Sequence, residues 1–401
     1  KSGDFENMTT GTNATDGMTF TIGSDQVNAI KYIKGLRTLL IGTTGGEFVA
    51  TASSSAEPIT PTNIQIKRQA GYGTSDVDAL LAGNRVLFVQ RAGKKVRELV
   101  FDFNSDGYVA PDLTILAEHI GGSGVGTGFT NWTYQQEPDS IVWVVRSDGV
   151  LTGMTYQRSE NVVAWHRHIL GGAFGNGIAE VESVAAISNT VTSSRGEDTL
   201  YMIVKRTVNG STVRYIEYLQ PFDFGSNIED AWFLDSGLLY SGSATTTLSG
   251  LSHLEGQTVS ILANGSTHAD KVVSSGAISL DRSVTKAIVG LKYTSKLQTM
   301  RIESGSADGS AQGKVKRIQE ITARFFETVG AEIGSNSTQT DLIPFRDSSM
   351  PMDQAVKLFS GDKQIEFNSD YETDGFVYIQ QEQPLPMTIT ALFPQLNTYD
   401  G

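Results

Sequence analysis

Short apolar runs separated by tight-turn dipeptides recur along the whole chain. β-branched and aromatic residues fill runs such as 140–145 and 150–156, with an Asp-Gly pair between them. Asn-Gly and Asp-Gly favour type I′ turns, because both central residues need positive φ and the resulting twist matches that of the strands. Two-residue turns are predicted at Gly45-Gly46, Asp106-Gly107, Asp148-Gly149, Asn209-Gly210, Asn264-Gly265 and Asp374-Gly375. Hairpins spread over the whole chain predict an all-β sandwich, barrel or propeller.

Helical patterns are scarce. Residues 112–120 predict a short helix that Asp112 caps and Gly121-Gly122 ends, and residues 25–34 are a second helical candidate. The apolar residues of 312–329 fit helical spacing in part and strand alternation in part, and we interpret this stretch as a strand.

The segment from residue 234 to residue 303 has the character of a separate small module. It is rich in Ser, Thr and Gly, contains its own Asn-Gly turn, and has Gly-Ser flanks at 241–243 and 304–306. We therefore predict a β body over 1–233, an inserted small β domain over 234–303, and the second part of the body over 304–401. The opening residues Lys1 to Phe5 show neither an initiator Met nor a signal pattern, so we expect a fragment of a longer protein.

Composition excludes several classes of chemistry. The 401 residues include no cysteine, so disulfides, thiolate catalysis and Cys-ligated metals are ruled out. No apolar run approaches the ~18 residues of a membrane helix. The net charge of −13 argues against a DNA-binding surface, which is usually basic. The same charge is compatible with a passage along which DNA slides without sticking.

An ordered series of short motifs runs through the chain. Its members are residues 1–7 (KSGDFEN), 87–99 (LFVQRAGKKVREL), Tyr108, 112–114 (DLT), 134–138 (YQQEP), 141–151 (IVWVVRSDGVL), 154–158 (MTYQR), 163–168 (VAWHRH) and 382–387 (EQPLPM). In this order they resemble the nozzle proteins of short-tailed bacteriophages, also called tail tubular protein B. The resemblance covers most of the chain. It implies a β-propeller-like body with an inserted small β-sandwich or barrel domain, and members are usually longer at the N-terminus.

The resemblance also implies a role, a location and partners. Nozzle proteins are structural virion proteins that assemble as a ring, expected to be a hexamer, below the portal and adaptor in the phage tail. The ring would be the conduit for genome ejection and a docking platform for tail fibres or spikes. Its partners would be itself, the adaptor ring, the fibres or spikes, and the host envelope. Phage DNA would pass transiently and non-specifically, without stable nucleic-acid binding. From the net charge of −13 we add the hypothesis that an acidic lumen repels DNA phosphates and keeps friction low.

Two other functions stay open at this point. One is a carbohydrate-binding or carbohydrate-cleaving β protein at the tail tip, which would need exposed aromatic surfaces and two facing carboxylates. The other is a bacterial propeller scaffold with no role in a phage.

Two segments have residue types that can bind metals. Residues 102–107 match the first half of a calcium loop, but its twelfth position holds Leu113 in place of Glu, so we favour an Asp-Gly hairpin and leave only a weak cation site at Asp102–Asp106 open. His166 and His168 would share one face of a strand. Zinc would need a third ligand, and we expect a packed, hydrogen-bonded strand instead.

The remaining polar clusters predict no catalytic site. The acids weighed for a glycosidase pair are Asp148, Glu160, Asp223, Glu229 and Asp230, whose spacing requires no such pair. The glycine-rich stretch 121–128 lacks the Lys of a phosphate loop and is interpreted as a flexible loop that narrows a channel or contacts a neighbour. Two basic clusters would contact phosphates without reading sequence if they faced DNA, but we favour a solvated hairpin with salt bridges between subunits; they are Arg91, Lys94, Lys95, Arg97 and Lys314, Lys316, Arg317. We assign no catalytic, cofactor-binding or metal residue, and expect no enzyme activity.

Overall fold

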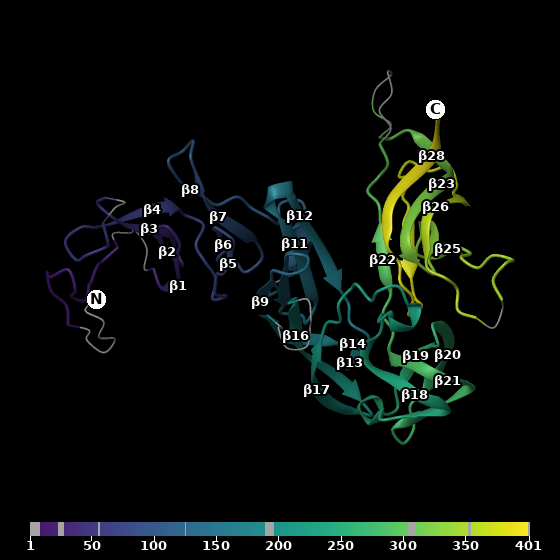
Figure 1. Cartoon of the computed structure of the whole chain (residues 1–401). Helices are drawn as coiled ribbons and strands as arrows, with labels where there is room; N and C mark the ends of the chain where they lie inside the picture. Colours follow the sequence, from purple (N-terminus) through teal and green to yellow (C-terminus); the bar gives the residue numbers. More distant parts are fainter. Residues whose placement is uncertain are drawn as a thin grey trace. The chain divides into compact units, whose positions relative to one another are not determined.

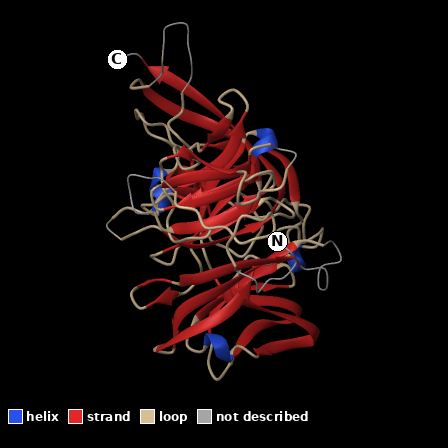
Figure 2. Cartoon of the chain, turned by 90° about the vertical axis from the view of Figure 1, so that its left-hand side faces the viewer, coloured by secondary structure: helices blue, strands red, loops and turns tan. Residues whose placement is uncertain are grey.

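A computed structural model describes residues 9–22, 28–54, 57–124, 126–188, 196–303, 310, 312–351 and 354–399. Strands dominate this part of the chain (Figure 2), and its only helices are four short 3-10 segments: η1 (Glu118–Gly121), η2 (Arg158–Glu160), η3 (Ile228–Asp230) and η4 (Ser252–Leu254). The all-β prediction is therefore confirmed. The chain divides into two compact units, one of residues 1–168, 180–204 and 215–219, the other of residues 169–179, 205–214 and 220–401.

The first unit contains three four-stranded antiparallel sheets that follow one another along the chain (Figure 1). The first sheet is β1 (Ile30–Gly35), β2 (Leu39–Thr43), β3 (Gly46–Ala52) and β4 (Ile64–Ala70); the second is β5 (Leu80–Ala82), β6 (Arg85–Val89), β7 (Val96–Asp102) and β8 (Gly107–Val109); the third is β9 (Phe129–Gln135), β10 (Ile141–Arg146), β11 (Leu151–Gln157) and β12 (Val162–His168). In each sheet, sequential strands are neighbours. Consecutive four-stranded meanders of this kind are the organisation of propeller blades.

Apolar side chains of the meanders form cores that join one sheet to the next. One core combines Tyr32 and Leu40 of the first sheet with Phe88 and Leu99 of the second. Another combines Leu87 of the second sheet with residues of the third, including Trp132, Val142 and Met154. The continuous apolar runs in β6 and β10 follow from this arrangement, since both faces of these central strands are buried.

Two further sheets follow the third meander along the chain. One has the order β15 (Glu180–Ser188), β16 (Asp198–Val208) and β17 (Ser211–Tyr218), and its residues are divided between the two units. The other is the two-stranded pair β13 (Ala173–Phe174) and β14 (Gly177–Ile178), in the second unit.

The second unit contains a sheet within the stretch predicted as an inserted domain. Its order is β18 (Asp235–Ser249), β21 (Ala277–Leu291), β19 (Thr258–Ala263) and β20 (Ser266–Val272). Thirteen buried residues, all between Leu248 and Leu291, form its core. The sheet is open, with β18 and β20 as edges. The predicted boundaries at 234 and 303 stay predictions, and the flank 304–306 lies outside the described residues.

The C-terminal part of the second unit is built from two sheets. One has the order β22 (Ser295–Gln298), β27 (Tyr378–Gln381), β24 (Glu332–Asn336) and β25 (Gln339–Leu342); the other has the order β26 (Phe359–Glu366), β23 (Val315–Thr328) and β28 (Ile389–Tyr399). Residues of both sheets form one core, in which Ile333 and Ile379 lie with Ile321 and Phe325. The interpretation of 312–329 as a strand is confirmed by β23.

The predicted turns differ in how closely the structure follows them. Asn209-Gly210 and Asn264-Gly265 each join two strands as two-residue turns, with φ between 47° and 74° at all four residues. Longer loops, 103–106 and 147–150, close the hairpins predicted at Asp106-Gly107 and Asp148-Gly149. The turn predicted at Gly45-Gly46 lies one residue earlier in the chain, at 44–45. The prediction at Asp374-Gly375 was wrong, because β26 and β27 on either side pair with other strands.

The two helix predictions were wrong where the structure describes the chain. Over 112–120 only η1 forms, because the backbone before it pairs with β7: the Leu113 N–H donates to the Val96 carbonyl at 2.9 Å. The Asp112 carboxylate accepts from the Thr114 N–H at 2.8 Å, so this potential cap closes a turn instead. Within 25–34, residues 30–34 belong to β1, and 25–27 lie outside the described residues.

Candidate functional sites

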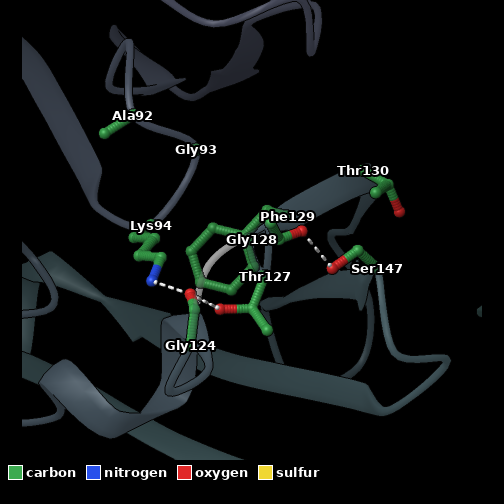
Figure 3. Close-up of a pocket in the computed structure, with 10 residues that line it drawn as sticks. Ala92, Gly93, Lys94, Gly124, Thr127, Gly128, Phe129, Thr130 and Ser147 are labelled. Atoms are coloured by element: carbon green, nitrogen blue, oxygen red, sulfur yellow. Dashed lines mark hydrogen bonds between the residues drawn. The ribbon is translucent and has the colours of Figure 1, made fainter.

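The glycine-rich stretch lines a pocket of about 460 Å³ in the first unit (Figure 3). Gly93 and Lys94 come from the β6–β7 loop, and the other wall consists of residues 124 and 126–130 with Ser147. Gly128 is required here, because a Cβ atom would lie 2.8 Å from the Gly93 carbonyl oxygen. Lys94 Nζ and Thr127 Oγ1 both donate to the Gly124 carbonyl, at 2.7 and 2.9 Å. The loop is thus tethered at Gly124; Val125 lies outside the described residues.

The chemistry of this pocket is limited. Its lining supplies one ammonium group and the hydroxyls of Thr127, Thr130 and Ser147, and it contains no carboxylate and no imidazole. A second pocket, of about 350 Å³ in the second unit, is lined mainly by apolar side chains and likewise has no acidic residue in its lining. Neither pocket therefore holds the two facing carboxyls of a glycosidase.

The acids considered for such a pair do not face one another in the first unit. Asp148 precedes β11 and Glu160 follows it, so about seven strand residues, or about 20 Å, separate them. Asp148 is also bonded by Arg146.

The acids of the second unit have local partners. Asp230 forms an ion pair with Lys286, and Asp223 accepts the Gly225 N–H at 2.9 Å. Glu229 precedes Asp230 in η3.

Asp102 is the last residue of β7, and residues 103–106 form the loop that joins it to β8. The Asp102 carboxylate accepts the backbone N–H of Ser105 at 3.1 Å and of Asn104 at 3.4 Å. The Ser105 side chain, with these N–H groups, lowers the pKa of Asp102. The Asp102 carboxylate oxygens therefore accept hydrogen bonds from their own loop. Within the described residues no group of three or more His, Cys, Asp or Glu side chains is arranged to hold a metal ion.

His166 and His168 lie on one face of β12, as alternation requires, and bond to each other, with Nδ1 of His166 2.7 Å from Nε2 of His168. The Trp143 ring packs against both imidazoles, with centroids 5.8 and 5.0 Å away. Gly153 lies opposite His166 in β11, where a Cβ would be 2.1 Å from the imidazole. The arrangement is a packed pair, as the strand interpretation expected.

This pair makes stability depend on pH. Burial, and then the neighbouring His166, lower the pKa of His168 to about 4, from 6.5 in an unfolded chain. Between these values the unfolded state binds a proton that the folded state does not, so stability falls as the pH falls from 6.5 to 4. Urea unfolding followed by tryptophan fluorescence should show that the free energy of unfolding falls less over this pH range in His168→Phe than in the parent chain. Equal losses would contradict the assignment.

A buried ionic cluster, which the sequence analysis missed, joins the second and third meanders. Glu98 of β7 is completely buried and is bonded by Arg85 Nη1 of β6. Its other oxygen lies 2.9 Å from Nε of Arg158, the first residue of η2. Burial and the Glu98 carboxylate raise the pKa of Tyr156 beside it. We call these residues the Glu98 clasp. The sequence signal that could have revealed this cluster is Glu98 itself. Its carboxylate stands at an inward-facing strand position, and a buried charge requires partners.

The predicted motifs meet one another in the structure. Glu98 of the 87–99 motif contacts Arg158 of the 154–158 motif. Gln135 of the 134–138 motif accepts the Trp143 indole N–H at 2.7 Å and donates to the Asp198 carbonyl at 2.8 Å. The Glu98–Arg158 contact therefore joins the second meander to the third, and Gln135 joins the third meander to β16. The motif at 1–7 lies outside the described residues.

Three residues of the first basic cluster make contacts within the chain, and one of them, Lys95, is paired with acids. Lys95 pairs with Asp112 and Glu118 at 3.0 and 3.2 Å, and these acids raise the pKa of Lys95. The Arg97 guanidinium stacks 3.5 Å above the Tyr72 ring. Lys94 is held by Gly124, and Arg91 is exposed in the β6–β7 loop.

The second basic cluster is not a solvated hairpin. Lys316 is 1% exposed and donates to the Ile302 carbonyl at 3.1 Å. Arg317 lies 5.5 Å from the Tyr371 ring, and Lys314 is half-buried.

No helix in the described part of the chain is long and apolar enough to cross a membrane.

Comparisons with known proteins identify no family. A scan of protein-family models and a search of curated proteins find no match. Among solved structures, the chain is similar to an exo-β-1,3-galactanase from Phanerochaete chrysosporium in complex with β-1,3-galactotriose. The alignment covers 93% of this chain and 82% of the galactanase chain at 10% identity, with a TM-score of 0.25. A likeness this weak supports no argument about activity.

Proposed function

We propose that this chain is a structural subunit of the tail nozzle of a short-tailed bacteriophage. It assembles with copies of itself into a ring, a hexamer, below the portal and adaptor of the virion. The ring is the conduit for the genome and the platform on which tail fibres or spikes dock. DNA passes through it without stable binding, and the chain has no catalytic role.

The main support for this proposal is the position of the family-like motifs in the structure. The motifs between residues 87 and 168 lie on the strands and loops of two successive blade-like meanders. Their polar members, Glu98, Gln135 and Arg158, bond to other parts of the same unit. Motifs that specify a scaffold support a structural role.

The charge distribution and the pockets also support a non-enzymatic conduit. The net charge of −13 suits a surface along which phosphates do not adhere. Neither described pocket has an acidic side chain in its lining, which weighs against carbohydrate cleavage.

The location can be tested on purified virions. Gold-labelled antibodies raised against the 401-residue chain should mark the tail, between the adaptor and the distal tip. Label on the capsid shell alone, or no label on virions, would contradict the proposal. In a parallel assay the chain should release no reducing sugar from host polysaccharide, and release would favour the tail-tip carbohydrate function.

A further inference from the structure

The β7–β8 hairpin of the first unit ends in an exposed aromatic knob. Phe103, in the loop between the strands, is 89% exposed. The loop is held in shape by the two N–H groups that the Asp102 carboxylate accepts, and Phe101 and Tyr108 support the stem with an edge-to-face ring contact at 5.5 Å. An exposed phenyl ring on an ordered hairpin is suited to anchor an interface, because aromatic residues, Phe included, are enriched at protein–protein interfaces.

A matching socket lies in the second unit. The pocket of about 350 Å³ described above is lined by seven apolar side chains that include Leu342, Phe345 and Leu385. Leu342, on the edge strand β25, is 64% exposed at its rim. A cavity of about 150 Å³ already admits a benzene ring, so this socket has room for a phenylalanine side chain.

The charges beside the knob and the socket are opposite. Asp102 and Asp106 are the charged residues of the 102–107 loop, and Arg346 is the one charged residue that lines the socket. The Arg346 guanidinium donates to the Pro351 and Gln354 carbonyls. Its positive charge therefore has no carboxylate partner among the residues that the structure describes. An acidic knob entering this socket would supply one.

We infer that the Phe103 knob of one copy of the chain inserts into the Leu342–Arg346 socket of a second copy. The two surfaces differ, so the contact is heterologous, and heterologous contacts produce rings when the rotation between copies closes. The inference rests on the proposed function and identifies the surfaces through which the ring assembles.

The absence of cysteine makes a site-specific cross-linking test clean. Phe103→Cys and Leu342→Cys chains are mixed and treated with a short bis-maleimide. Covalent dimers should form in the mixture and be scarce in either variant alone. The matched control is Leu116→Cys, 98% exposed in the same unit as Phe103, which should not cross-link to Leu342→Cys. Phe103→Ser, which removes the ring without adding charge, should weaken self-association at least about tenfold, and Leu116→Ser should not.

The outcomes separate this inference from the proposed function. Chains that assemble into a ring without the Phe103–Leu342 cross-link would overturn the inference and leave the nozzle function standing. Cross-linking of Phe103→Cys to itself would indicate a symmetric contact and would also overturn it. Phe103→Ser that abolishes adaptor binding but not self-association would assign the knob to the adaptor, again against the inference. A chain that never self-associates would overturn the inference, while gold labelling of virions would still test the function independently.

Discussion

Replacing both arginines of the Glu98 clasp with methionine (Arg85→Met with Arg158→Met) should destabilise the first unit by about 3–5 kcal/mol at pH 7. Glu98 has no exposed surface, so without the guanidinium groups its charge would be left buried and unpaired. Methionine keeps much of the apolar stem of each arginine, which separates the loss of charge from the loss of packing. Urea unfolding followed by tryptophan fluorescence measures the change, since Trp132, Trp143 and Trp165 lie in the adjoining meander.

The pH dependence of this variant distinguishes the cost of a buried, unpaired charge from a loss of packing. An unpaired buried carboxyl has a pKa above the unfolded value of about 4.3, so the folded state binds the extra proton. The stability deficit of the double variant relative to the parent chain should therefore shrink as the pH falls toward about 4.3, while both chains share the loss caused by His168. Adding Glu98→Met should restore stability at pH 7 and remove this pH dependence of the deficit. A double variant that unfolds at the same urea concentration as the parent chain would contradict the clasp.

Phe88→Ala should cost about 3–5 kcal/mol, because truncating a buried phenylalanine leaves a cavity that its neighbours fill only in part. Phe88 is completely buried in β6, and its ring lies 6.2 Å from that of Tyr32 in the first meander. The loss therefore acts on the core shared by the first two meanders.

Phe101→Ala is the matched control for this prediction. Phe101 lies in the neighbouring strand β7 but is 48% exposed, and its ring contact with Tyr108 is worth about 0.5–1.5 kcal/mol. Urea unfolding should rank Phe88→Ala well below Phe101→Ala in stability. Equal effects would show that the shared core does not hold the two meanders.

The sequence predicts the fold class well because turn chemistry and strand patterns are local. Asn209-Gly210 and Asn264-Gly265 adopt the positive φ angles that their residue types favour. The helix expected over 112–120 failed because tertiary pairing with β7 overrode a local cap signal. Local patterns show which residues alternate between the two faces of a strand, but they do not show which sheets pack against each other.

The interactions that characterise this chain are mostly between segments distant in sequence, which explains why the sequence did not reveal them. Glu98 and Arg158 are 60 positions apart and meet only when two meanders pack. Lys316 looks like part of a basic surface in sequence, yet it is buried against the carbonyl of Ile302. The knob at Phe103 and the socket at Arg346 likewise required the structure, because exposure and concavity are not properties of a residue type.

The central claim is that this chain is a ring-forming structural subunit, and measurement of its mass in solution tests that claim most directly. Native mass spectrometry or sedimentation of the 401-residue chain, alone and mixed with the adaptor ring, should give a closed assembly of six copies that binds the adaptor. A chain that remains strictly monomeric in both conditions and ignores the adaptor would contradict the nozzle assignment.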